Sequence, residues 1–435
     1  MESTGRISNK ETFFIGLMLF SLFFGAGNLI FPPVLGLNAG EHAWPAIIGF
    51  LISGVGLPIL GVLAITYIGS SDAEGLSRRV HPKFAVAVTT LAYFTIGPLF
   101  AVPRTGTVSY EMAIVPFLTN GGSSLSLLIF TLIYFAIVYA LALNPGKFVD
   151  RIGKIITPFL LLVIFTLLAA AVFGPLGTYQ APTEAYTNYP LFKGITEGYL
   201  TMDTIASIVF GIIVVKAIED RGANNRMMVQ KAAWKAGLVA AVCLGTVYAG
   251  LGYLGATSAT AISAQTGPEI LAAVSRAYFG VYGNVILGLA ILFACIPTAT
   301  GLISSCAIYI NRRFPRLSYP LLVLLFTLLS LVIANFGLAN VISLSVPVLH
   351  FIYPIIMVLI FLAFLDKMIG ERRSIYQFAV LFTGIVSLND GLLAANPDWG
   401  YLGFLALPFA ELGLAWVVPA LLGAVIGFVV SLFQK

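Results

Sequence analysis

The feature that most constrains this chain is a series of long apolar runs that contain no charged residue. A helix needs about 20 residues to cross roughly 30 Å of hydrocarbon. Because the backbone finds no water there, apolar runs of this length and continuity form helices. Only 9% of the 435 residues are charged, against about a quarter in soluble domains, which excludes an ordinary soluble protein. The sufficiently long runs cover residues 12–40, 84–103, 112–146, 155–183, 236–268, 277–311 and 317–365.

These runs predict an all-α polytopic membrane protein, with residues 1–435 forming one transmembrane domain. The longest run suffices for two spans, because the Gly and Asn residues between Asn335 and Asn340 favour a turn. Twelve transmembrane helices are therefore expected, at residues 12–36, 45–69, 84–108, 124–143, 153–174, 197–218, 234–255, 283–311, 317–334, 341–365, 375–393 and 412–432.

The basic residues predict the orientation of these spans. With a cytoplasmic N-terminus, all but three of the 23 Lys and Arg residues fall on the inner side; the exceptions are Arg104, Lys193 and Arg276. This asymmetry follows the positive-inside rule, so both termini are expected in the cytoplasm and the protein in the cell membrane. The basic charge thus reflects topology, and no nucleic-acid partner is expected. The three cysteines, Cys243, Cys295 and Cys306, are interpreted as packing residues.

The order of the spans indicates an inverted repeat. Spans 1 to 5 occupy residues 11–174 and spans 6 to 10 occupy residues 196–366, which are blocks of nearly equal length. Because five is odd, the second block starts on the opposite side of the membrane from the first. Many secondary transporters have this arrangement, with the first helix of each repeat broken at the binding site. Two further spans, within residues 375–432, complete the chain.

Span 1 carries two glycines in the middle of the membrane, Gly25 and Gly27. Each costs a helix about 1 kcal/mol relative to alanine, which an unwound stretch would explain. Such a stretch frees carbonyls to hold a cation, and the amides that start the next half-helix attract an anion. Close packing of helices through small residues is the alternative explanation.

Span 6 is the only span with a carboxylate near its middle, Asp203. A charged Asp at the centre of a membrane helix costs roughly 2.5 to 3.5 kcal/mol, so it is expected to face a cavity, an ion or a partner. Thr204 and Ser207 extend a polar stripe from it. The alternative is a structural Asp bonded to backbone amides at a helix break.

Span 8 contains Pro297 followed by Thr298. The proline frees the carbonyl of Phe293, and a hydroxyl beside free carbonyls suits a monovalent cation. The alternative is that Thr298 only bonds back to its own helix.

Three motifs carry a resemblance to a known family: SLFFGAGNLIFPP at residues 21–33, PRTGTVSYE at 103–111 and MDTIASIVFGIIVV at 202–215. Over nearly its whole length the chain resembles the bacterial branched-chain amino acid carriers of the BrnQ type. The resemblance implies a LeuT-like fold of five plus five helices, with two C-terminal helices added. It also implies sodium-driven import of leucine, isoleucine and valine, with no cofactor besides the transported ion.

The resemblance further implies a set of site residues. The substrate would contact the span 1 break, where the amides of Ala26 and Gly27 meet its carboxylate, and span 6, where Asp203 meets its ammonium group or a second cation. Sodium would contact main-chain carbonyls and one hydroxyl. The substrate residues are Gly25, Ala26, Gly27, Asn28, Asp203, Thr204, Ser207 and Phe210, and the sodium residues are Ser21, Phe24, Ala294 and Thr298. The chain departs from that fold at Pro297, where a second hydroxyl residue is common, and at Asp203, which has no clear counterpart.

Other functions stay open at this stage. The coupling ion could be a proton, with Asp203 as the titrating group. An intramembrane enzyme would need a motif such as HExxH, which no span contains, and a channel would need a pore-lining filter. Arg104 and Glu111, near the expected outer end of span 3, suit either an extracellular gate or a structural role, and we favour the latter. The sequence does not indicate an oligomeric state.

Overall fold

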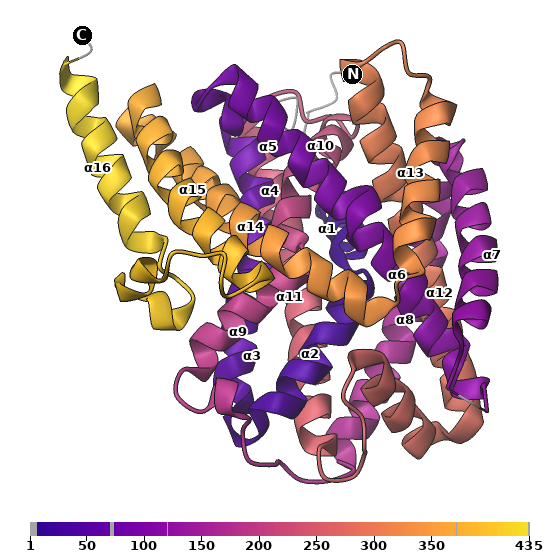
Figure 1. The fold of residues 1–435 in the computed structure, drawn as a ribbon. Coiled ribbons are helices and arrows are strands. Elements are labelled where there is room, and N and C mark those ends of the chain that lie inside the picture. Colours follow the sequence, from indigo (N-terminus) through magenta and orange to yellow (C-terminus); the bar gives the residue numbers. More distant parts are fainter. Residues whose placement is uncertain (1–6, 70–73, 120, 371, 434–435) are drawn as a thin grey trace.

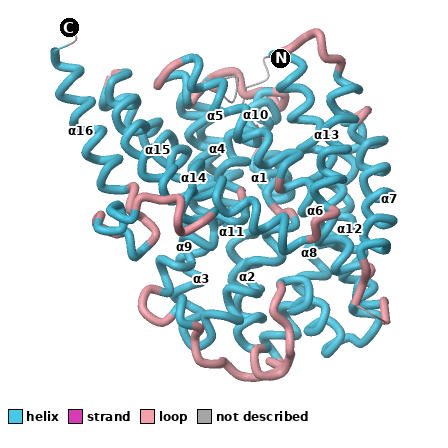
Figure 2. The backbone as a smooth tube through the Cα atoms, in the orientation of Figure 1, coloured by secondary structure: helices cyan, strands magenta, loops and turns pink. Residues whose placement is uncertain are grey.

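A computed structural model describes residues 7–69, 74–119, 121–370 and 372–433, and within these ranges the chain forms helices and no strand (Figures 1 and 2). The helices are α1 (Asn9–Phe23), α2 (Ala26–Ala39), α3 (Ala43–Leu51), α4 (Leu57–Ile68), α5 (Pro82–Phe94), α6 (Ala101–Ala113), α7 (Ser124–Ala142), α8 (Pro145–Phe173), α9 (Pro190–Gly198), α10 (Asp203–Glu219), α11 (Arg226–Ser258), α12 (Gly267–Arg313), α13 (Tyr319–Ala334), α14 (Leu338–Ile369), α15 (Arg373–Ala395) and α16 (Val417–Phe433).

Helical residues occupy every range in which a span is expected. In the described parts of the chain, seven continuous helical segments are long and apolar enough to cross a membrane, or eight if the bent pair α9 and α10 counts as one span. The polytopic helical class is therefore confirmed, although length and composition do not by themselves give the expected number of twelve.

Outward-facing apolar side chains show which surfaces suit lipid. On α7, Leu125, Ile129 and Ile133 are all more than half exposed and recur every fourth residue, which places them on one face of the helix. On α16, Leu421 and Val425 are similarly exposed. Exposed apolar surface of this extent fits a hydrocarbon solvent and not water.

Two broken helices lie at the centre of the fold. The first break falls between Phe23, where α1 ends, and Ala26, where α2 begins. The second falls at Met202, a non-glycine residue with a φ of 67°, and bends α9 relative to α10 by 51°. Because α1 packs on α10 and α2 packs on α9, the two breaks lie side by side.

Two further spans are irregular where the sequence contains Gly or Pro. A π-helical turn, Ile52–Gly56, joins α3 to α4, and another, Thr95–Leu99, joins α5 to α6. In the second turn Gly97 has a non-helical ψ of −121°, and Pro98 follows it. Span 3 continues beyond its expected end at residue 108, since α6 ends only at Ala113. Arg104 consequently lies deeper in the protein than the sequence predicted.

The remaining helices support the two broken ones. Helix α11 packs along α1 and α2, α4 packs on α10, and α6 packs on α12. Helices α15 and α16 pack on each other at one edge of the molecule, next to α14 (Figure 1). The described chain begins and ends at the same end of the molecule (Figure 1).

Candidate functional site

A small cavity lies where the two breaks meet. Its volume is about 30 Å³, which is room for about one water molecule, so the centre of the protein is closed in this structure. The lining comes from α1, α2, α6, α10 and α12 and the segments next to them. It comprises Leu22, Phe23, Gly25, Ala26, Gly27, Asn28, Ile96, Ala101, Arg104, Thr105, Thr201, Met202, Asp203, Ala206, Phe210, Thr298 and Leu302.

The N-terminus of α2 forms one wall of this cavity. Gly25 precedes the helix in an extended conformation, with φ −122° and ψ −165°, and its amide donates to Oδ1 of Asn28 over 3.1 Å. The first amides of a helix have no intrahelical acceptor, and Ala26 and Gly27 contribute two of them here. The span 1 glycines therefore lie at an unwound stretch, as one of the two explanations given for them predicts. The positive end of the α2 dipole forms this wall of the cavity.

Asp203 forms the opposite wall as the first residue of α10. Asp203 is buried, with 4% of its surface exposed. Oδ2 accepts a hydrogen bond of 2.5 Å from Nδ2 of Asn28 and one of 3.2 Å from the hydroxyl of Tyr248. Asn28 also donates to that hydroxyl. A buried carboxylate is thus held by neutral donors, which satisfy its oxygen without cancelling its charge.

Aromatic rings provide the apolar part of the lining. Phe23 and Phe210 meet edge to face, with ring centroids 5.4 Å apart, and join the two broken helices. Ala206 and Leu302 extend this surface. An apolar surface therefore lies beside the charged wall.

The polar stripe expected on span 6 is divided by the structure. Asp203 and Phe210 line the cavity, whereas Thr204 and Ser207 do not. The Thr204 amide donates to the hydroxyl of Tyr353 over 3.2 Å, and the Ser207 hydroxyl donates to the carbonyl of Thr204 over 2.6 Å. The Thr204 hydroxyl also donates to the carbonyl of Ser53 over 3.5 Å, and the Ser207 hydroxyl lies against Gly61, so both face α4 and its preceding turn.

The expected sodium residues lie near the breaks and only partly in the cavity wall. Thr298 lines the cavity, and its methyl group would lie 3.4 Å from a methyl group added at Gly25. Its hydroxyl donates a hydrogen bond to the carbonyl of Ala294 over 3.0 Å, as the alternative of bonding back to its own helix expects. The hydroxyl oxygen still has lone pairs that can bind a cation. Ser21 lies in the last turn of α1, and Phe24 directly follows the helix.

Arg104 is the principal site residue that sequence reasoning missed. It lines the cavity with 2% of its surface exposed, and its guanidinium lies against Gly27. Gly97 and Pro98, a dipeptide that typically interrupts a helix, were the available signal that a new helix, α6, begins just before Arg104. Tyr248 had no comparable signal, since a tyrosine in an apolar helix is ordinary.

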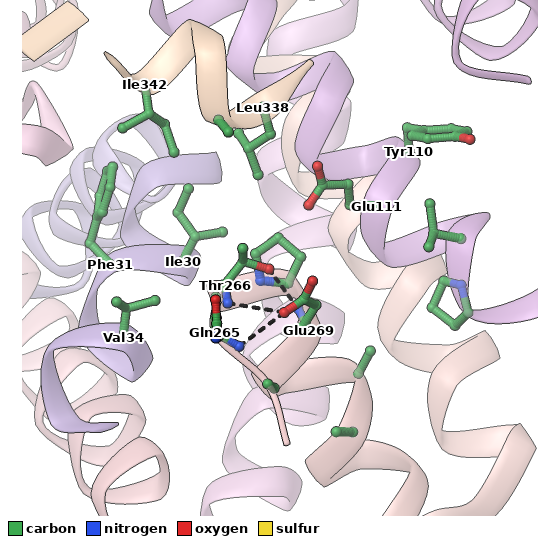
Figure 3. A pocket seen from close by; sticks show the side chains of 18 of the residues that line it. Ile30, Phe31, Val34, Tyr110, Glu111, Gln265, Thr266, Glu269, Leu338 and Ile342 are labelled. Carbon is green, nitrogen blue, oxygen red and sulfur yellow. Dashed lines mark hydrogen bonds between the residues drawn. The ribbon is translucent and has the colours of Figure 1, made fainter. Parts of the chain in front are cut away.

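Larger openings flank the closed centre on both sides. A pocket of about 830 Å³ faces the end opposite the termini, and Glu111 of α6 and Glu269 of α12 point into it (Figure 3). The Glu269 carboxylate accepts hydrogen bonds from the amides of Gln265 and Thr266, which directly precede α12. A second opening of about 690 Å³ lies at the other end, between α4, α10 and α11.

Two openings that face opposite ends, with a closed polar cavity between two broken helices, define a membrane transporter. The fold agrees with solved transporters: Mhp1, a nucleobase–cation symport family protein in a closed conformation with bromovinylhydantoin bound, matches with a TM-score of 0.63 and 15% identity over 97% of this chain and 92% of that one. MhsT in complex with L-phenylalanine matches with a TM-score of 0.59 and 16% identity over 98% of both chains. The LeuT-like fold expected from the sequence is therefore confirmed.

The chain belongs to the family described as branched-chain amino acid transport protein, whose model matches residues 8–434. It is 51% identical to the branched-chain amino acid permease BraB of Bacillus subtilis, over 98% of this chain and 96% of that protein. The permease BrnQ of the same organism is 44% identical, over 99% and 98% of the two chains. A Pseudomonas aeruginosa transport system 2 carrier is 43% identical, over 95% and 94%. The expected family and the non-enzymatic class are thereby confirmed.

Proposed function

We propose that this protein imports leucine, isoleucine and valine by sodium-driven symport. The observation that carries the proposal is the central cavity, where a buried carboxylate, free helix amides and an aromatic wall meet. An α-amino acid needs these three kinds of partner: Asp203 suits its ammonium group, the α2 amides suit its carboxylate, and Phe23 and Phe210 suit a branched aliphatic side chain. The names of the three permeases and carriers support the same substrate class.

The proposed sodium site uses the C-terminal end of α1 and the neighbouring turn of α12. Ser21 and Phe24 would contribute carbonyls, Ala294 a carbonyl and Thr298 its hydroxyl oxygen. Oxygen donors without charge suit a hard monovalent cation. The contact between Gly25 and Thr298 supports this site, because it brings α12 to the unwound stretch of span 1.

The proposed arrangement in the cell membrane has twelve spans with both termini in the cytoplasm. The repeats are residues 11–174 and 196–366, in opposite orientations, so that the broken first helices of both meet at the cavity. The side-by-side breaks support this assignment. Transport then requires alternating access, in which one opening closes as the other reaches the site.

The test is uptake of labelled leucine by proteoliposomes that contain the purified protein. An inward sodium gradient should drive saturable accumulation against the leucine gradient, and choline in place of sodium should abolish it. Unlabelled isoleucine and valine should compete, while charged amino acids should not. Accumulation that persists without sodium would refute sodium coupling, and non-saturable downhill flux would indicate a channel.

Proton coupling is the second candidate, and the position of Asp203 favours it. This carboxylate lies in the cavity and, among the described residues, has no cationic partner within 4 Å. If a proton drives transport, a pH gradient that is acidic outside should replace the sodium gradient in the same vesicles. Sodium-dependent uptake that ignores an imposed pH gradient would exclude this candidate.

Thr298→Ala should raise the sodium concentration for half-maximal uptake severalfold, because it removes one of few ion ligands. Thr300→Ala is the matched control, because Thr300 lies two residues after Thr298 in α12. Its hydroxyl also donates back to its own helix, to the carbonyl of Ile296 over 2.8 Å. An identical sodium dependence in the two variants would remove Thr298 from the site.

Asp203→Asn should reduce leucine uptake by at least about tenfold at unchanged expression, because the ammonium group loses a charged partner worth roughly 1.5 to 3 kcal/mol. Asp390→Asn, which changes another carboxylate of a membrane helix, should transport normally. Wild-type uptake by Asp203→Asn would show that the carboxylate is dispensable.

A further inference from the structure

Arg104 presents a buried cation to the central cavity. Its Nη1 donates to the carbonyl of Leu200 over 2.7 Å, and Nη2 donates to the carbonyl of Thr201 over 3.3 Å. The guanidinium also lies over the Phe31 ring, 5.1 Å from its centroid. These contacts fix the group between α2, α6 and the break that precedes α10.

The contacts do not neutralise the charge of Arg104. Its Nε is buried and, within the described residues, has no hydrogen-bond partner. No carboxylate of those residues forms an ion pair with it within 4 Å, although Asp203 lines the same cavity. A buried charge inside a membrane protein is costly without a paired counterion, so the guanidinium as it stands lacks a directly paired anion.

The place where an anion fits is set by two independent positive groups. The guanidinium lies so close to Gly27 that an added methyl group there would be 2.6 Å from Nη2. Gly27 belongs to the first turn of α2, whose amides and dipole also attract negative charge. A guanidinium and a helix N-terminus held this close repel each other, and an anion bound beside both would offset that repulsion.

We infer that Arg104 binds the carboxylate of the transported amino acid, together with the first amides of α2. Asp203 then lies across the cavity with the opposite charge, and the two groups are kept apart so that a zwitterion can bridge them. This inference rests on the proposed amino-acid transport and adds to it the residue that selects for a free carboxylate. A substrate without that carboxylate leaves the arginine unpaired.

The experiment compares two ligands that differ in this group alone. Leucine and leucinamide share the side chain and the ammonium group, but leucinamide replaces the carboxylate with a neutral amide. Calorimetric titration of the purified, sodium-saturated protein, at a pH where both amines are protonated, gives the ratio of their affinities. Wild-type protein should strongly prefer leucine, and Arg104→Gln should lower the ratio by at least about tenfold, as expected for a lost charge-assisted hydrogen bond.

Arg276→Gln is the matched control, because it removes an exposed arginine of the outer pocket and should keep the wild-type ratio. If Arg104→Gln does not fold, Arg104→Lys replaces it, and its ratio should fall severalfold because an ammonium cannot form paired parallel hydrogen bonds. An unchanged ratio in the folded Arg104 variant would overturn the inference, even if both affinities fall together. A residue with a purely structural role would change the affinities for leucine and leucinamide by the same factor. Absence of leucine binding to the wild type would instead refute the proposed function.

Discussion

At the scale of single residues, Asn28 shows how a neutral group organises a charged site. Its Oδ1 must accept from the Gly25 amide, which fixes the orientation of the side-chain amide and turns Nδ2 toward Asp203. The same nitrogen also contacts the Tyr248 hydroxyl. The side chain of Asn28, expected to contact substrate, is therefore committed to holding the unwound stretch of span 1 against the start of α10.

The two glycines of span 1 should respond differently to an added methyl group. Gly27→Ala should weaken leucine binding by about tenfold or more, because the methyl group would displace the Arg104 guanidinium, which it meets at 2.6 Å, and cost it a charge-assisted hydrogen bond. Gly25→Ala should bind nearly normally, since its nearest neighbour would be 3.4 Å away and its φ is accessible to alanine. Equal affinities of the two variants by calorimetry would contradict this account.

Residue patterns predicted part of the site and not the rest, for identifiable reasons. Gly25 and Asp203 were recognisable because a glycine pair and a carboxylate are both costly in a membrane helix. The positions of Thr204 and Ser207 depend on how α10 is rotated against α4, which helical spacing does not determine. Arg104 was visible as a charge, but its depth depends on α6 continuing to Ala113, beyond the expected end of span 3.

At the scale of elements, close backbone contact holds the second half of span 1. Helix α2 packs on α11 so tightly that a methyl group on Gly36 would lie 1.8 Å from the carbonyl oxygen of Gly252. A helix interrupted at its middle has fewer hydrogen bonds of its own, so α2 relies on such packing. Close packing through small residues was the alternative explanation for Gly25 and Gly27, yet the tight contact occurs at Gly36, about three turns beyond the start of α2.

Gly36→Ala should lower the free energy of unfolding by about 1 to 3 kcal/mol or more, because two backbones would have to separate. Gly245→Ala, in the partner helix α11, meets no atom within 4 Å and should be neutral or stabilising by up to about 1 kcal/mol. Thermal unfolding of both variants in one detergent provides the comparison. A Gly36→Ala protein as stable as Gly245→Ala would refute the tight contact.

At the scale of the whole molecule, the cavity and its two flanking openings form one axis. Phe31 and Leu200 line the pocket of about 830 Å³, while Arg104 and Thr201 line the central cavity, so the contacts of Arg104 separate the two. Long apolar runs predicted the helices well because backbone groups in hydrocarbon must form their hydrogen bonds within the protein, and a long continuous apolar run does so as a helix. The closed state of the centre was not predictable, since it depends on side chains from five helices.

The orientation in the membrane can be tested with single cysteines at the two openings. In a Cys243→Ser background, Ala273→Cys in the outer pocket should react with a membrane-impermeant maleimide added to intact cells. Asn224→Cys, in the opposite opening, should react only after the cells are permeabilised. The reverse pattern would invert the proposed topology, because both positions lie far from the closed centre.

The small volume of the central cavity has a consequence for the energy supply of a cell. A continuous file of water through a membrane protein conducts ions and protons down their gradients, and each copy would then drain the stored voltage. A central cavity of about 30 Å³, with room for about one water molecule, cannot hold such a file. In this state the closed centre therefore blocks the leakage of ions and protons through the protein.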